Sequence, residues 1–238
     1  MKRHLVNIIN ILYLFFLLSC TSQSTVSINN GYVDFPEVRA LKAKTIQLDT
    51  ALFCYPFRVH AWDNKAVVLD LHGTDHYFHA FSYPEFHYLS SFGKRGDSPE
   101  EMLSAENFRW GEKCLWTLDA NKSELTELGF ALSGDTLLRQ EVVKLDKDIL
   151  RALDFIIYED FTFIIPAYTG DNRFCQVSSE GKLLRKFGAI PSANEEALAN
   201  SRPALAQAWR SFIDYNPRKG VLVAATPVSY THLTLPTT

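Results

Sequence analysis

Short apolar runs separated by turn-forming residues dominate the chain beyond residue 50. The runs AVVLDL, DHYFHAF, FHYLSSF, CLWTLD, FTFIIP and VLVAAT are rich in β-branched and aromatic residues. The segments between them, such as 72–75 and 178–181, carry the Gly, Ser, Asn and Asp residues that favour turns. The 3.6-residue periodicity of amphipathic helices is missing from these runs. The pattern therefore predicts an all-β chain of short strands.

The runs recur along the sequence at a fixed distance. The string LSSFG at 89–93 returns as LRKFG at 184–188, and each Gly is followed 7 and 8 residues later by a Glu-Glu pair. Asp70 and Asp119 each end an apolar run, and they lie 49 residues apart. A unit of about 48 residues with about four strands has the dimensions of a β-propeller blade. Residues 57–227 hold three such units and the start of a fourth, about 3.5 four-stranded blades.

Short helices are expected in the connections between blades. Ser98, Pro99 and Glu101 have the order of an N-cap, a first helical residue and a capping glutamate. A similar string begins at Ser192, and a further helix is expected from about Pro203 to Phe212. The acidic pairs of these connections suit the positive end of a helix dipole better than acid–base catalysis.

The first connection, FGKRGDSPEEM, contains an Arg-Gly-Asp triplet at 95–97. The repeat accounts for its glycine and its turn without an adhesion role. The string resembles the F-G-x-x-G-x-x-P-x-E-F/M connection of the TolB-like six-bladed propeller lipoproteins of Gram-negative bacteria, and residues 184–188 are a weaker copy without the second Gly and the Pro. The resemblance covers about residues 40 to 227. It implies a six-bladed propeller, present here in part, with a binding or scaffolding role.

The N-terminal segment has the features of a targeting sequence. Residues 1–20 combine Lys2 and Arg3 with an apolar run too short to span a bilayer, which is typical of a signal peptide. The string LLSC ending at Cys20 resembles a lipobox, in which the cysteine is acylated; Leu18 is an unusual residue there, so ordinary secretory cleavage stays open. Residues 21–40 are interpreted as a tether and lead-in. We expect a lipid anchor in the outer membrane, with the periplasmic side favoured over the cell surface.

The last residues, 228–238, carry no charge and continue no blade. They resemble a translated sequencing adapter, and the alternative is a genuine C-terminal strand. Under the first interpretation residues 41–227 form part of a propeller whose further blades lie beyond the given sequence.

Charge and cysteine content narrow the function classes. Removal of residues 1–19 leaves 22 basic and 27 acidic residues, a net charge of −5, which disfavours nucleic acid as a partner. Cys54, Cys114 and Cys175 do not form a metal-binding pair and are interpreted as small buried hydrophobic residues, with one disulfide left open.

Three acidic residues recur just before apolar runs. Asp63, Glu112 and Asp160 are spaced by 49 and 48 residues. They could point into the central channel and hold a cation such as calcium, but one turn cap per blade is the favoured explanation, because periodic recurrence is what a structural role predicts. The histidines at 72, 76 and 79 lie in or beside a run that alternates as a strand, which disfavours a metal site, and no cofactor is expected.

The sequence contains no GxSxG, Walker or HExxH motif. The favoured function is therefore a non-catalytic propeller that binds a protein or glycan partner. A rim of exposed tryptophans would suit such binding, although most of the four are more simply explained as core between blades. The alternative is a hydrolase or lyase acting on a saccharide or lactone, which three or more acids, Asn or His converging on the channel would favour. A structural member of an envelope complex, with a large apolar patch away from the axis, is the third interpretation.

Overall fold

The computed structural model describes residues 39–46, 48, 53–112, 114–131, 137–190, 195–200, 202–226 and 232–236. Contacts divide the chain into two units, Met1–Thr45 and Ile46–Thr238, and every described strand belongs to the second. Residues 1–20, with Cys20 and the lipobox, and residues 192–194 lie outside the described part. No helix in that part is long and apolar enough to cross a membrane.

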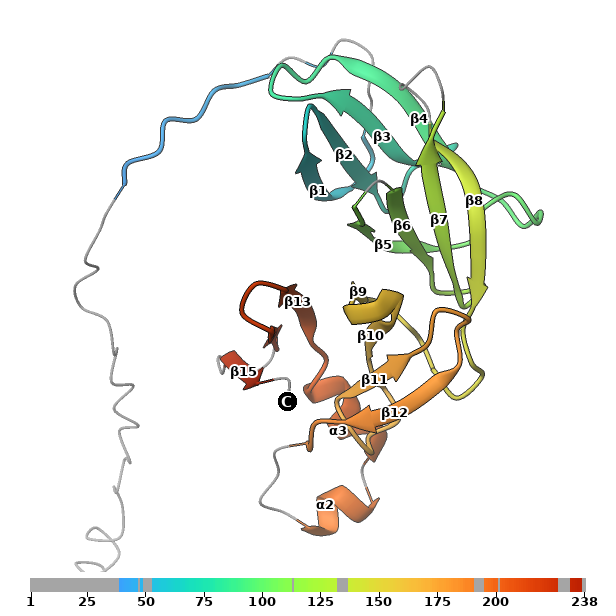
Figure 1. The fold of residues 1–238 in the computed structure, drawn as a ribbon, viewed down its shortest axis with the longest axis vertical. Coiled ribbons are helices and arrows are strands. Elements are labelled where there is room, and N and C mark those ends of the chain that lie inside the picture. Colours follow the sequence, from blue (N-terminus) through green and yellow to red (C-terminus); the bar gives the residue numbers. More distant parts are fainter. Residues whose placement is uncertain are drawn as a thin grey trace, which may run out of the picture. The chain divides into compact units, whose positions relative to one another are not determined.

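The strands form four antiparallel sheets that follow one another along the chain (Figure 1). Sheet 1 contains β1 (Pro56–Trp62), β2 (Lys65–Asp70), β3 (His76–Ser82) and β4 (Tyr88–Lys94). Sheet 2 contains β5 (Ala105–Trp110), β6 (Cys114–Asp119), β7 (Glu124–Phe130) and β8 (Leu137–Lys144). Sheet 3 contains β9 (Ile156–Ile157), β10 (Phe163–Pro166), β11 (Phe174–Val177) and β12 (Leu183–Phe187). Sheet 4 contains β13 (Phe212–Asn216), β14 (Val221–Ala225) and β15 (His232–Pro236).

In each sheet the strands pair in chain order, which confirms the predicted propeller blades. A hydrophobic layer fills the space between each sheet and the next, so the sheets stack in sequence order. In β6, Leu115 belongs to the layer shared with sheet 1, whereas its neighbour Trp116 belongs to the layer shared with sheet 3. Successive strand residues point to opposite faces, so a strand between two layers must be apolar on both. This explains the near-continuous apolar runs of the sequence.

The repeated Phe-Gly pair has a packing cause. The ring of Phe92 stacks on Phe78 of the neighbouring strand with centroids 5.2 Å apart, and Gly93 follows with φ 65°. A Cβ at Gly93 would lie 2.6 Å from the Phe78 ring. The second copy repeats this at Gly188, with φ 76° and a Cβ position 2.9 Å from the Phe174 ring. A left-handed conformation against an aromatic ring requires glycine.

The repeated aspartate also has a structural cause. Asp70 is fully buried at the end of β2 and accepts the backbone N–H of Cys54 at 2.7 Å. Asp119 stands in the same place at the end of β6 and accepts the N–H of Leu103 at 2.7 Å. Donor and acceptor are 16 residues apart in both pairs. Each carboxylate thus fastens the chain that enters a blade to the end of that blade's second strand.

The connections differ from the prediction at one point. Residues 98–101 form a turn, closed by the Glu101 N–H on the Ser98 carbonyl at 3.0 Å, and the prediction of a helix there was wrong. The chain returns at once to a parallel bridge between Arg95 and Met102, which leaves no length for a helix. Helices do form later in the chain, as α2 (Glu195–Asn200) and α3 (Arg202–Ala208). Helix α3 ends before the predicted limit at Phe212, because Phe212 is the first residue of β13.

The cysteines fit their prediction in part. Cys175 is buried in the layer between sheets 2 and 3, whereas Cys114 is half-buried and Cys54 is exposed, so burial was wrongly predicted for Cys54. All three are thiols in the structure. The segment of β15 falls in the part interpreted from the sequence as non-native, and it pairs with β14 along five residues.

Candidate functional site

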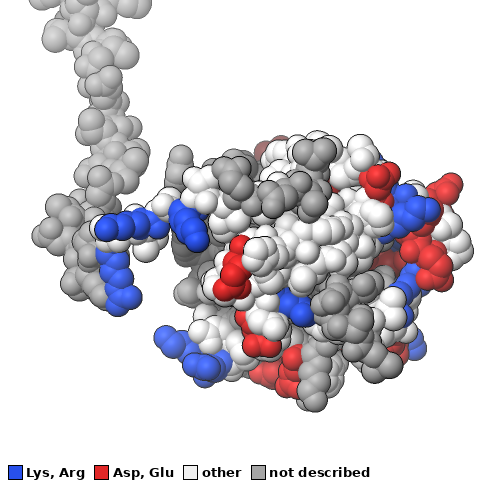
Figure 2. All heavy atoms as spheres, turned by 90° about the horizontal axis from the view of Figure 1, so that it is seen from above, with Lys and Arg blue, Asp and Glu red and all other residues white. Residues whose placement is uncertain are grey.

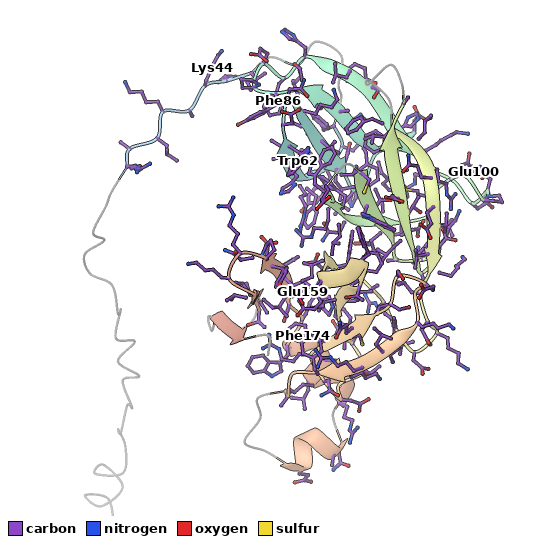
Figure 3. All side chains as sticks on the ribbon, viewed as in Figure 1. Lys44, Trp62, Phe86, Glu100, Glu159 and Phe174 are labelled. Carbon is purple, nitrogen blue, oxygen red and sulfur yellow. The ribbon has the colours of Figure 1, made fainter. Side chains whose placement is uncertain are left out.

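A hollow of about 520 Å³ lies where the first strands of the sheets end. Sheet 1 contributes the end of β1, and sheets 2, 3 and 4 contribute the hairpins that follow β5, β9 and β13. Figure 3 labels Trp62 at the end of β1 and Glu159 beside β9, two members of its lining. The full lining is His60, Trp62, Arg109, Trp110, Gly111, Glu112, Cys114, Trp116, Ile156, Ile157, Tyr158, Glu159, Phe161, Asp214, Tyr215 and Pro217.

Aromatic side chains dominate this lining. Phe161 is 70% exposed and Trp62 is 48% exposed, although both are large apolar residues. Tyr158 and Tyr215 contact each other edge to face, with centroids 5.0 Å apart, and so join the hairpins of sheets 3 and 4. Exposed rings around a concave surface are typical of binding sites, since they offer large apolar area at low conformational cost.

The side chain of Arg109, which lines the hollow, connects three of the sheets that surround it. It donates from Nε to the carbonyl of Phe155 at 2.8 Å, and from Nη2 to Asp154 Oδ1 at 2.9 Å and to the carbonyl of Ile213 at 2.7 Å. Asp154, which is 2% exposed, also accepts the N–H of Ile213 at 2.9 Å and the amide of Asn107. One ion pair therefore ties sheets 2, 3 and 4 together. Burial raises the pKa of Asp154, and the Arg109 charge opposes that shift.

Two basic side chains near this ion pair, His60 and Arg58, have lowered pKa values. Burial, followed by the charge of Arg109, lowers the pKa of His60 below its usual value, so His60 is neutral near pH 7. The same two causes lower the pKa of Arg58 on β1, although a guanidinium stays charged at neutral pH.

Three carboxylates line the hollow, on three different hairpins. Glu112, Glu159 and Asp214 are all exposed. Glu159 accepts the hydroxyl of Tyr215 at 2.9 Å. Burial and this hydrogen bond raise the pKa of Tyr215 to about 12, so its hydroxyl remains a donor. Each carboxylate has four lone-pair positions, so all three keep capacity to accept hydrogen bonds from a ligand.

The three acidic residues singled out in the sequence occupy equivalent hairpins. Asp63 lies in the β1–β2 turn with φ 53° and is not part of the lining, whereas Glu112 lies in the β5–β6 hairpin and is. Asp160 lies in the short 3-10 helix η1 (Glu159–Phe161) of the β9–β10 hairpin, and its side chain is outside the described part. Among the described side chains, no three His, Cys, Asp or Glu are grouped so that they could hold a metal ion.

Sequence reasoning missed Arg109, Glu159 and Asp214. Arg109 had no motif, Glu159 is the neighbour of the chosen Asp160, and Asp214 belongs to the incomplete fourth unit. Trp62, Trp110 and Trp116 line the hollow, but only Trp62 among them is exposed, whereas Trp116 is buried between sheets 2 and 3 and Trp110 packs against the core between sheets 1 and 2. Trp209 does not line the hollow, and it packs instead against the guanidinium of Arg173 at 5.3 Å.

Two other hollows, of about 520 and 510 Å³, are less suitable. The first lies on sheet 2, where Lys144 pairs with Glu124 at 2.5 Å and Arg139 with the same carboxylate at 3.6 Å. The second belongs to the β13–β14 hairpin alone. Over the face of the blades that Figure 2 shows, basic and acidic side chains lie in mixed groups, which gives no continuous basic surface there.

The family model of the TolB-like 6-blade propeller-like proteins matches residues 34–234. The chain belongs to this family. Among solved structures it is similar to a proposed exported protein from Bacteroides fragilis, with 13% identity and a TM-score of 0.56 over 80% of this chain and 51% of that one. It is also similar to a proposed 6-phosphogluconolactonase from Bacteroides uniformis, with 10% identity and a TM-score of 0.47 over 76% of this chain and 57% of that one.

No curated protein matches the sequence. The chain spans about half the length of the solved proteins named above, at 51% and 57%. At 13% identity the similarity to the Bacteroides fragilis protein shows the fold alone, and the family rests on the match of the family model.

Proposed function

We propose that this TolB-like propeller is a lipid-anchored protein of the cell envelope that binds a partner, a protein or a glycan, in the aromatic hollow without transforming it. The exposure of Phe161 and Trp62 beside free acceptor oxygens is the observation that carries the proposal. Rings that are exposed in a concave site contribute binding energy when a partner covers them. The lipobox-like string ending at Cys20 supports the lipid anchor, and the similarity in fold to a proposed exported protein agrees with a place in the envelope.

A propeller hydrolase or lyase acting on a saccharide or lactone is the second candidate. Three carboxylates and His60 line the hollow, which is the convergence that such an enzyme requires. The three carboxylates are exposed to solvent, however, and catalytic acids are usually held in shielded environments. Binding is therefore the better supported function.

The test is capture of partners from an envelope extract by the immobilised protein. The variant Trp62→Ala with Phe161→Ala removes two exposed residues of the hollow. The control, Tyr83→Ala with Leu138→Ala, removes two residues of similar exposure, 43% and 55%, outside its lining. We expect the first variant to lose the captured material and the control to retain it.

Equal capture by the two variants would contradict the proposal. Turnover of a saccharide or lactone that Glu112→Gln abolishes would replace it with the enzyme function.

A further inference from the structure

The charges around the hollow are unbalanced. Its lining carries three carboxylates, from Glu112, Glu159 and Asp214, against the basic side chains of Arg109 and His60. The charge of Arg109 is met by Asp154 at 2.9 Å and by two backbone carbonyls. His60 is neutral near pH 7, because burial and Arg109 lower its pKa. Even with Arg58 and Asp154 included, four carboxylates face two guanidinium groups, so the hollow is electronegative.

The aromatic rings act in the same direction as the carboxylates. The face of an aromatic ring is electron-rich and attracts cations, most strongly for Trp and Tyr. Trp62, Tyr158 and Tyr215 lie around the same space as Glu159, on three different sheets. A cation with an apolar stem would contact the rings and the carboxylates together, whereas a neutral sugar would gain only the ring contacts. Clefts lined by charges of one sign also concentrate ligands of the opposite sign.

We propose that the hollow takes the positively charged side chain of a protein partner, with its alkyl stem on the aromatic rings and its ammonium attracted by the negative charge of Glu112, Glu159 and Asp214. This inference rests on the proposed function, since it names the partner class of the same site. Charge complementarity favours the protein over the glycan that the proposed function also allows.

Tryptophan fluorescence provides the readout, since three of the four tryptophans line the hollow. The variant Trp209→Phe removes the one that does not. This protein is titrated with Nα-acetyl-lysine methylamide, with the norleucine analogue that lacks the ammonium, and with cellobiose as a neutral saccharide. We expect saturable quenching by the lysine compound, with an affinity about tenfold higher than for either neutral compound.

Two matched sets of substitutions locate the effect. The hollow set is Glu112→Gln, Glu159→Gln and Asp214→Asn, and the control set is Glu85→Gln, Glu141→Gln and Asp148→Asn, at exposed residues outside the lining. Both sets remove three negative charges. The hollow set should weaken binding of the lysine compound about tenfold, and the control set should leave it within about twofold.

Equal affinity for lysine and norleucine compounds, tighter binding of cellobiose, or equal loss in both sets would overturn the inference. The binding function would survive the first two results, because the hollow would still take a ligand. If none of the three compounds changed the fluorescence up to its solubility limit, the inference would fail, and capture by the Trp62→Ala, Phe161→Ala variant would decide the proposed function separately.

Discussion

Two groups of acidic residues in this propeller serve opposite purposes. Asp70 and Asp119 are buried at strand ends, where their oxygens accept backbone N–H groups and hold each blade to the chain that enters it. Glu112 and Glu159 stand exposed on hairpins around the hollow. The first group recurs at the period of the fold, and the second is assembled by the stacking of different sheets. Recurrence alone does not separate the two groups, since Glu112 also recurs at the period of the fold; burial and backbone hydrogen bonds mark the scaffold, and exposure beside other sheets marks the candidate site.

Asp154 is buried behind the hollow and holds Arg109 in its lining, and its loss should have the largest effect. The substitution Asp154→Ala removes the carboxylate that meets Arg109 and the N–H of Ile213. A buried guanidinium left without its partner typically costs about 3–5 kcal/mol. Urea denaturation should show this loss of unfolding free energy, and Asp154→Asn, which keeps an acceptor, should lose less. Equal stability of all three proteins would show that the ion pair does not hold the sheets together.

Asp119→Ala tests the scaffold group. The carboxylate accepts N–H groups from Leu103, Asn121 and Lys122 at 2.7, 3.0 and 2.9 Å. Their loss in a buried position should lower the unfolding free energy by about 3 kcal/mol. Under the same denaturation assay Glu112→Gln should change stability by less than about 0.5 kcal/mol. A cost for Glu112→Gln as large as that for Asp119→Ala would remove the distinction between the two groups.

Gly93→Ala tests the repeated Phe-Gly pair. The new Cβ would meet the Phe78 ring at 2.6 Å in a backbone with φ 65°, and overpacking with left-handed strain should cost about 2 kcal/mol. Gly96→Ala is the matched control in the same connection, since its Cβ would meet only the carboxylate of Glu101, at the end of a flexible side chain. The control should cost clearly less, as measured by thermal unfolding, and the reverse order would contradict the packing explanation.

The smallest expected effect is a pH dependence that originates at the hollow. Since the pKa of His60 is lowered in the folded protein, the unfolded chain binds a proton that the folded one does not when the pH falls below the usual histidine value. Stability should therefore decrease between about pH 7 and pH 5. His60→Asn should reduce this slope, and His79, whose pKa burial also lowers, should account for what remains. An unchanged slope would show that His60 is not the titrating group.

The scaffold could be predicted from the sequence, whereas the site could be predicted only in part, at Glu112 and Trp62. The Phe-Gly pair and the repeated aspartate are local requirements of each blade, so they recur at 95 and 49 residues and revealed the period. Arg109 acts through the carbonyls of Phe155 and Ile213, which lie 46 and 104 residues further along the chain. Such contacts depend on how sheets stack, and no spacing within one unit encodes them. Glu159 directly precedes the chosen Asp160 in the 3-10 helix η1 and has no counterpart at the repeat spacing.

The role of the hollow in binding is tested most directly by site-specific photo-crosslinking. Benzoylphenylalanine replaces Phe161, which is 70% exposed in the hollow, or Tyr83, which is 43% exposed outside its lining. Each protein is illuminated in an envelope extract of the organism that carries the gene. The account predicts one defined crosslinked partner from position 161, suppressed by excess Nα-acetyl-lysine methylamide, and none from position 83. A partner crosslinked from position 83 alone would contradict it.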